Sequence, residues 1–468
     1  MRLKLILIVW LTAALLPAAA QSQLPETPAA KQFSGWLAAF NSGDRETILK
    51  FLQGNYPQRV PQIDQLMRFQ GQVGGFDFKK VEESSPTRLT GIVKEHNSDA
   101  FARFEITVDP AEPHRITVLN FRRLEEMPPP RTSEAEALAA LRAKLAKESA
   151  ADRFAGAVLV AHYGKPVFQE AYGLADREKK LPNSLSTRFR IGSMNKMFTA
   201  VATLQLVEAG KIKLTDPLGK YLTDYPNKDV ASKVTIHHLL THTGGTGDFF
   251  GPQFNAHRLE LRTIQDYVKL YGQRGLEFEP GSRWAYSNYG FLLLGVLIEK
   301  VTGQSYYDYV QEHVYKPAGM TSTASLAENE TVPGRSTGYT KGPGGDSWHP
   351  NTDTLPYRGT SAGGGYSTVE DLLRFANALE QHKLLNAQNT ELLTTAKDNP
   401  GGVRYAYGFF DQVEGGVRCF GHGGGAPGMN GDLKICPTAG YVVAVLANMD
   451  PPAAERISDF VANRLPEK

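Results

Sequence analysis

Cysteine is scarce in this chain, because the 468 residues include only two, Cys419 and Cys436. Two cysteines are too few for the disulfide framework that holds small secreted domains together. No cluster of His, Cys and Asp has the spacing of metal ligands, and the run 235–238 is better explained as a helix start capped by Thr235. We therefore expect neither a metal nor a cofactor.

An excess of charge of one sign is also missing. The chain has 51 Lys and Arg against 49 Asp and Glu, which gives a net charge of +2. This balance provides no electrostatic attraction to nucleic acid or to an anionic membrane surface. The length and the 41% hydrophobic content predict a globular protein of two or more domains. We expect a small-molecule or peptide substrate as the partner, and no nucleic acid.

The apolar run at residues 1–20 predicts a secretory signal peptide. Arg2 and Lys4 form a basic start, residues 5–16 form the apolar run, and three alanines at 18–20 precede Gln21 as a cleavage site. The run is short for a membrane span, although an uncleaved anchor is the alternative. We expect an exported protein, periplasmic or secreted, with no stable membrane anchor after cleavage.

Residues 21–127 are predicted to form an α+β domain. Apolar residues at helical spacing predict helices ending near Gly43, beginning at Asp44 and spanning 62–69. Strand-like runs follow at 76–81, 89–93, 101–108 and 116–121. The order of elements resembles the NTF2-like (cystatin-like) cone fold. No convergent acid–base set occurs here, so we expect a packing or positioning role. Residues 128–132 form a proline-rich linker.

Residues 133–468 are predicted to form a second α+β domain. A helix at 133–147 and strands at 156–162 and 166–173 precede a largely helical region to about 330 and a long loop at 331–365. The helix at 367–379 begins with a capping pair, Ser367 and Glu370. Strands at 407–413, 417–420, 432–436 and 441–447 lead to a closing helix at 453–465.

A Ser-x-x-Lys motif, Ser193 and Lys196, lies where a strand-like run ends at Gly192 and an apolar helix begins. The spacing places both side chains on one face of a helix, within reach of each other. A serine hydroxyl is a poor nucleophile until a nearby base takes its proton, and a close amine is such a base. The plain alternative is a capping serine followed by a solvated lysine, so the downstream motifs decide.

The second motif is Tyr286 and Asn288, which stand in a loop just before the apolar run 291–298. A loop at the start of a buried helix is a rigid mount for a catalytic side chain. A similar run at 225–227 has a central proline between polar segments and is interpreted as a turn.

The third motif is the run His422, Gly423 and Gly424, at the end of the strand that holds Cys419. Residues without side chains at a strand edge let a substrate pair with the backbone. The similar run that begins at His242 ends a helix and precedes Tyr286 in the chain, so its order and context do not fit a third motif.

In this order, Ser193-x-x-Lys196, Tyr286-x-Asn288 and His422-Gly423-Gly424 resemble the three motifs of the serine β-lactamase and penicillin-binding-protein superfamily. The nearest branch is that of class C β-lactamases with the related family VIII esterases and D-aminopeptidases. The resemblance covers most of residues 135–466. It implies the β-lactamase/transpeptidase-like fold, an antiparallel sheet flanked by helices with a helical lobe, and an active site between the two.

The resemblance also implies roles for the matching residues. Ser193 would be the nucleophile, and Lys196 and Tyr286 would share the role of acylation base, with the division between them open. Tyr286 would also activate the deacylating water. Asn288 would orient Lys196 and bind the substrate. The backbone N–H groups of Ser193 and Gly425 would form the oxyanion hole.

The third motif departs from the family pattern, because many β-lactamases and cell-wall peptidases have Lys-Thr-Gly where this chain has His422-Gly423-Gly424. We therefore expect an exported serine hydrolase that prefers esters or D-amino-acid amides. Arg358 is a candidate for the missing cation. A β-lactamase or cell-wall D,D-peptidase is one alternative, and a catalytically silent binding or scaffold protein is another. Cys419 and Cys436 are either bridged between two antiparallel strands or left as two buried thiols.

Overall fold

The computed structural model describes residues 23–98, 100–124, 129–341 and 347–467. The predicted signal peptide and residues 125–128 lie outside these ranges. The chain divides into two compact units, Met1–Pro128 and Pro129–Lys468. In the described residues no helix is both long and apolar enough to span a bilayer.

The first unit packs helices against one face of a four-stranded antiparallel sheet with the order β1-β2-β3-β4. Asp44 caps the second helix as expected, by accepting a hydrogen bond from the Thr47 amide. Phe33 of the first helix stacks on Phe104 of the sheet, with ring centroids 3.8 Å apart. The elements are α1 (Pro28–Asn41), α2 (Arg45–Asn55), the 3₁₀ turn η1 (Pro57–Gln62), α3 (Ile63–Val73), β1 (Phe76–Ser84), β2 (Arg88–Glu95), β3 (Phe101–Val108) and β4 (Ile116–Leu124). The likeness to NTF2-like folds stays a prediction.

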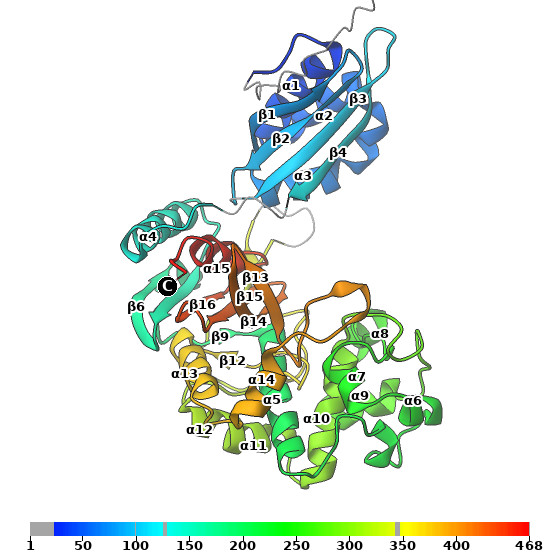
Figure 1. Ribbon diagram of the computed structural model, residues 1–468, viewed down its shortest axis with the longest axis vertical. Coiled ribbons are helices and arrows are strands. Elements are labelled where there is room, and N and C mark those ends of the chain that lie inside the picture. The colour runs from blue at the N-terminus through cyan, green and yellow to red at the C-terminus, as the bar shows by residue number, and fades with distance from the viewer. Residues whose placement is uncertain (1–22, 99, 125–128, 342–346, 468) are drawn as a thin grey trace, which may run out of the picture. The chain divides into compact units, whose positions relative to one another are not determined.

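The second unit is built on a six-stranded antiparallel sheet with the order β13-β14-β15-β16-β5-β6 (Figure 1). The strands are β5 (Gly156–His162), β6 (Lys165–Tyr172), β13 (Phe410–Glu414), β14 (Val417–Ala426), β15 (Met429–Cys436) and β16 (Tyr441–Ala447). Short strands complete the unit: β7 (Leu174–Asp176), β8 (Leu181–Pro182), β9 (Phe189–Arg190), β10 (Tyr339–Thr340), β11 (His349–Pro350) and β12 (Tyr366–Ser367).

Helices cover both faces of this sheet, because the central strands alternate apolar residues between two cores. Val158 and Val160 of β5 belong to the core with α4 (Glu134–Ala150) and α15 (Glu455–Ala462). Ala157 and Leu159 belong to the larger core, which contains α5 (Asn195–Glu208) and α13 (Val369–Glu380). A strand buried on both faces reads as a continuous apolar run, as this one does.

The remaining helices form the lobe that the resemblance predicted, with α6 to α10 gathered together beyond α5 (Figure 1). They and the other short helices are η3 (Leu218–Lys220), α6 (Lys228–Lys233), α7 (Ile236–Leu240), α8 (Pro252–His257), α9 (Ile264–Tyr271), α10 (Asn288–Thr302), α11 (Tyr306–Val310), the π-helical turn η4 (Gln311–Tyr315), α12 (Lys316–Ala318), α14 (Ala387–Thr394) and η5 (Pro400–Gly402). The predicted sheet, flanking helices and helical lobe are confirmed.

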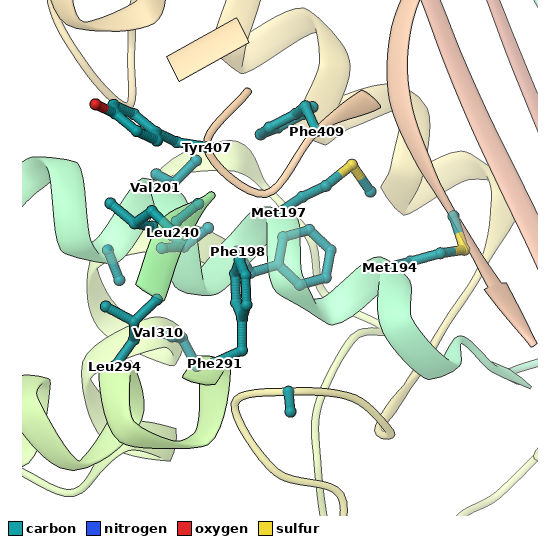
Figure 2. Packing of buried hydrophobic residues seen from close by; sticks show 14 of the residues in the cluster. Met194, Met197, Phe198, Val201, Leu240, Phe291, Leu294, Val310, Tyr407 and Phe409 are labelled. Carbon is teal, nitrogen blue, oxygen red and sulfur yellow. The ribbon is translucent and has the colours of Figure 1, made fainter. Parts of the chain in front are cut away.

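Helix α5 runs through the larger core. Figure 2 shows Met197 and Phe198 of α5 together with Phe291 of α10 and Phe409. Because buried side chains pack against its first turns, α5 holds the residues at its N-terminal end rigidly.

Three local predictions were wrong. Helix α13 is capped by Thr368, which accepts from the Asp371 amide, and not by Ser367 with Glu370. Strand β13 begins at Phe410, and β14 continues through its glycines to Ala426 instead of ending near residue 420. Glycines have low strand propensity, but pairing with β15 along residues 420–426 holds them in the sheet.

Cys419 and Cys436 form a disulfide between β14 and β15. Their strands pair antiparallel, and the next pair in the ladder is Phe420 with Ile435. The structure thus selects the bridged alternative over two buried thiols.

Candidate active site

Ser193 lies in the 3₁₀ turn η2 (Gly192–Met194) that joins β9 to α5. From the sequence, Ser193 was predicted to stand at the N-terminus of the helix, but α5 begins two residues later, at Asn195. Gly192 has a φ of +52°, a conformation that glycine adopts without steric cost. Its carbonyl accepts a hydrogen bond from the Gly364 amide at 3.0 Å, which ties the turn to the loop before β12. Ser193 is partly exposed at this turn.

Lys196 is fully buried and points its amine at Ser193. The distance from Nζ to the Ser193 Oγ is 3.2 Å, and Nζ also donates to the Asn288 Oδ1 at 2.7 Å and to the carbonyl of Ala362. Burial lowers the pKa of Lys196 to about 7, against the opposing effect of Asp248, which raises it. An ammonium loses hydration when buried, so the neutral amine is favoured. Near neutral pH a large share of Lys196 can therefore accept a proton.

Tyr286 completes the group around the serine. The centroid of the Tyr286 ring lies 4.7 Å from the Lys196 Nζ. Burial raises the pKa of Tyr286 well above its usual value of 10, and the neighbouring Ser193 hydroxyl opposes that rise only in part. The phenol therefore keeps its proton in the resting site. Of the two candidate bases, Lys196 is the one poised to take the serine proton.

Asn288 is the first residue of α10 and links the lysine to an acid that the sequence reasoning missed. Its Nδ2 donates to the Asp248 Oδ2 at 2.7 Å, and this fixes its Oδ1 toward the Lys196 amine. Asp248 lies in the glycine-rich segment after α7, and the only sequence signal was a lone acid among Gly, Thr and Phe. Asp248 and Asn288 are 40 residues apart in the sequence, and only the tertiary structure brings them together.

His422 in β14 is buried and uncharged. Its Nδ1 hydrogen-bonds to the Gly423 carbonyl, which can only accept, so Nδ1 carries the proton. The Nε2 lies 3.2 Å from the Tyr405 hydroxyl and accepts from it. Burial, and secondly the nearby Lys196, lower the pKa of His422 to about 3. The ring therefore offers a substrate neither a positive charge nor a free N–H.

The glycines that follow bring β14 against the nucleophile turn. A Cβ on Gly424 would lie 2.0 Å from the Ile191 carbonyl oxygen, so only glycine permits this approach. The position that a Cβ would take on Gly192 is 3.1 Å from the Gly425 amide nitrogen. Gly425 is exposed. The structure thus brings the segments of Ser193 and Gly425 together, as two donors of one oxyanion hole require.

Two residues discussed from the sequence take unexpected positions. Arg358, the candidate replacement cation, packs 3.4 Å from the Tyr307 ring centroid and donates through Nε to the Ser325 carbonyl. His242, set aside as a third motif, is buried with its ring centroid 4.3 Å from that of Tyr286. His242 was excluded as a third motif because it precedes Tyr286 in the chain. Its place in the chain does not show, however, how close it lies to Tyr286 in the folded structure.

Together these residues can perform acyl transfer. A serine hydroxyl contacts an amine with a lowered pKa and a phenol, and two backbone segments meet where an oxyanion would form. The described residues contain no group of three or more His, Cys, Asp and Glu side chains that could hold a metal ion.

Among proteins of known sequence, penicillin-binding protein 4* of Bacillus subtilis is 32% identical over 296 residues, which cover 59% of this chain and 64% of the relative. Esterase EstB of Burkholderia gladioli is 36% identical over 182 residues, 36% of this chain and 46% of the esterase. The chain thus spans less than two thirds of the length of these relatives.

Solved structures extend the likeness. A penicillin-binding protein of Bacillus halodurans aligns with a TM-score of 0.62 and 34% identity, over 68% of this chain and 98% of that one. A D-stereospecific amidohydrolase of Streptomyces sp. aligns with a TM-score of 0.58 and 28% identity, over 68% and 96%. The sequence profile of the β-lactamase family matches residues 141–467. This chain therefore belongs to the β-lactamase family, in the superfamily of serine hydrolases that includes the penicillin-binding proteins, the esterase and the D-stereospecific amidohydrolase named above.

Proposed function

We propose that this protein is an exported serine hydrolase that cleaves esters or D-amino-acid amides through an acyl-enzyme on Ser193. The observation that carries the proposal is the buried Lys196 amine, 3.2 Å from the Ser193 Oγ and held there by Asn288. The pKa of this amine is lowered to about 7, so it can act as a base at neutral pH.

In the proposed acylation step, neutral Lys196 accepts the Ser193 proton while Oγ attacks the substrate carbonyl carbon. The developing oxyanion is stabilised by the amides of Ser193 and Gly425, and one such donor contributes roughly 2.7–4 kcal/mol in other hydrolases. As the tetrahedral intermediate collapses, the leaving alcohol or amine receives the proton from Lys196, directly or through Tyr286. The products of this step are the acyl-Ser193 ester and the free leaving group.

In the proposed deacylation step, a water molecule attacks the acyl carbonyl. Its proton passes to the neutral Lys196, directly or relayed through the Tyr286 hydroxyl, and Lys196 returns a proton to the Ser193 Oγ as the tetrahedral intermediate collapses and the carboxylic acid leaves. The Lys196 Nζ lies 4.7 Å from the centroid of the Tyr286 ring, close enough for such a relay. The cycle ends with the site as it began.

The third motif supports this choice of substrate class. A β-lactam, or a peptide ending in D-Ala, carries a carboxylate near the scissile carbonyl, and a cation there forms a charge-assisted contact. His422 is neutral down to about pH 3 and its N–H is already donated to Gly423. Arg358 is held over Tyr307. Neutral esters and amides lose nothing by the absence of this charge, and the esterase and amidohydrolase relatives support the same choice.

A panel of three substrates tests this function: p-nitrophenyl butyrate, D-phenylalanine p-nitroanilide and nitrocefin, each with wild-type protein and with Ser193→Ala. We expect a higher kcat/KM for the ester or the D-amide than for nitrocefin, and no turnover by Ser193→Ala. Nitrocefin turnover as efficient as that of the best neutral substrate would support the β-lactamase alternative. Activity that survives in Ser193→Ala would refute the acyl-enzyme.

A further inference from the structure

His242 lies against the tyrosine of the candidate site, although it belongs to neither the second nor the third motif. It follows α7, is 1% exposed and has a φ of +60°. Outside glycine, this left-handed conformation is uncommon, and Asn, Asp and His adopt it more readily than other residues. The strain suggests that the position of this residue is held for a reason.

Two hydrogen bonds from neighbouring peptides converge on His242. The amide of Ala285 donates to the His242 carbonyl oxygen at 3.0 Å, and the amide of Ser287 donates to the His242 Nδ1 at 3.0 Å. The residues immediately before and after Tyr286 are thus bound to the same histidine, one by its backbone and one by its side chain. This arrangement fixes the peptide that carries the phenol on both sides.

The bond from the Ser287 amide to the His242 Nδ1 also affects Asn288, the next residue in the chain. Ser287 is the N-cap of α10, and its Oγ accepts from the Gly290 amide at 2.9 Å. Asn288, the first residue of the helix, holds Lys196 through its Oδ1. The His242 imidazole therefore fixes the position of the backbone at Ser287, where the loop that carries Tyr286 ends and α10 begins.

The hydrogen bonding of His242 excludes it as a proton acceptor in the reaction. Because Nδ1 accepts from the Ser287 amide, the proton of the neutral ring is on Nε2. This Nε2 is buried and has no hydrogen-bond partner among the described residues. Burial, with further contributions from Lys196 and His422, lowers the pKa of His242 well below its ordinary value. The ring stays neutral and has no free lone pair on nitrogen.

A purely structural role is the alternative, because the ring also contacts other aromatic side chains. Ring centroids of Phe291 and Tyr405 lie 5.0 Å and 4.7 Å from that of His242. A phenylalanine would fill the same space. It would leave the buried Ser287 amide without an acceptor, however, and it adopts positive φ less readily. The acceptor atom is thus what distinguishes histidine from an apolar ring here.

We propose that His242 is a positioning residue, which holds the Tyr286 hydroxyl at Ser193 by accepting the Ser287 amide hydrogen bond and packing against the phenol ring. The inference rests on the proposed function, since it assigns His242 to the acylation and deacylation steps at Ser193. It predicts an effect on kcat, and on the rate of Ser193 acylation, with little change in KM, because His242 contacts Tyr286 and not the substrate.

Two variants separate the acceptor from the ring. His242→Asn retains an oxygen acceptor near the position of Nδ1, and His242→Gly has none, while both residues tolerate the positive φ. We expect His242→Gly to lower kcat for p-nitrophenyl butyrate by about 100-fold, the typical cost of a catalytic group displaced by about 1 Å. His242→Asn should recover most of this loss. If His242→Gly does not fold, His242→Phe keeps the ring volume, lacks the acceptor and should show the same loss.

A double-mutant cycle with Tyr286→Phe distinguishes positioning from general destabilisation. If His242 acts through the phenol, His242→Gly should lower the rate of Ser193 labelling by a fluorophosphonate in wild-type protein and change it little in Tyr286→Phe. An undiminished effect of His242→Gly in the Tyr286→Phe background would overturn the proposal, and so would wild-type rates in His242→Gly. Failure of the wild-type protein to label at Ser193 would instead refute the proposed function, and the inference with it.

Discussion

At the scale of single residues, the burial of Lys196 determines what the site can do. A lysine in water is almost fully protonated at neutral pH and cannot accept a proton. Here the loss of hydration lowers its pKa to about 7, while the neighbouring Tyr286 has a raised pKa and keeps its proton. The pKa values of Lys196 and Tyr286 are ordinarily similar, and their surroundings shift them in opposite directions. Such a difference indicates which group acts as the base and which as the acid.

This difference predicts the pH dependence of acylation. The pKa of Lys196 is lowered, so the active, neutral amine is the form present above about pH 7 and is lost as the pH falls below it. The kcat/KM for p-nitrophenyl butyrate should rise about tenfold per pH unit below the pKa and level off above it. His422 should add no second limb between pH 5 and 8, because its pKa is about 3. A rate that is still rising steeply at pH 9–10 would show that Lys196 keeps an ordinary pKa.

The residues of the three motifs could be found from the sequence because each keeps a fixed spacing within its own segment. Ser193 with Lys196, and Tyr286 with Asn288, are local patterns in chain order. Asp248 and His242 have no such pattern. They reach the site only because the segment after α7 folds against the start of α10, with contacts such as that of the His242 Nδ1 with the Ser287 amide. Contacts of this kind depend on tertiary structure, which periodicity does not encode.

At the scale of elements, the close approach of β14 to the turn η2 brings together the two backbone segments of the candidate oxyanion hole. The long helices α4, α5 and α13 and the apolar strands β5 and β16 were predicted, because their residues follow a clear period or a continuous apolar run. The glycine part of β14 was not, since glycine has no strand propensity of its own. The adjacent capping residues Ser367 and Thr368 are similar in chemistry, and only the backbone conformation decides that Thr368 is the cap.

Neighbouring glycines in β14 provide a matched test of this approach. In Gly424→Ala the new Cβ would lie 2.0 Å from the Ile191 carbonyl oxygen, and the strand would have to move away from the Ser193 turn. In Gly423→Ala the nearest atom would be the Glu455 Oε1 at 3.4 Å, an ordinary contact. We expect Gly424→Ala to lower kcat by about 10²–10³-fold, the cost of a lost oxyanion donor.

The stability of the same two variants gives a second readout. Overpacking of this kind lowers the free energy of unfolding by roughly 1–3 kcal/mol. Thermal denaturation should therefore show a lower Tm for Gly424→Ala and a near wild-type Tm for Gly423→Ala. Equal behaviour of the two variants in activity and Tm would contradict the close approach of β14 and η2.

At the scale of the whole molecule, the proposed chemistry belongs to the second unit. All of the candidate site residues belong to Pro129–Lys468, and the three prolines at 128–130 precede the first helix of that unit. The division into two units could be predicted because successive prolines interrupt helices and strands. The role of the first unit could not, because its aromatic core serves packing and its sequence has no catalytic motif.

A truncated chain tests whether the second unit suffices. It should begin at Pro129, because Arg131 donates to the carbonyls of Ala462 and Leu465 and so fastens the start of the unit to its C-terminal end. We expect this chain to hydrolyse p-nitrophenyl butyrate with a kcat/KM within about threefold of the full-length protein, on the premise that domains fold as units. Loss of all activity in a truncated chain with a wild-type circular dichroism spectrum would assign residues 21–127 to the site.

The central claim, that Ser193 is the acylated nucleophile, is tested most directly by intact-mass spectrometry after treatment with a fluorophosphonate. The account predicts one adduct per chain, located at Ser193 by peptide mapping, which is absent in Ser193→Ala and forms faster at pH 8 than at pH 6, as the lowered pKa of Lys196 requires. An adduct on any other residue, or unchanged labelling of Ser193→Ala, would contradict it.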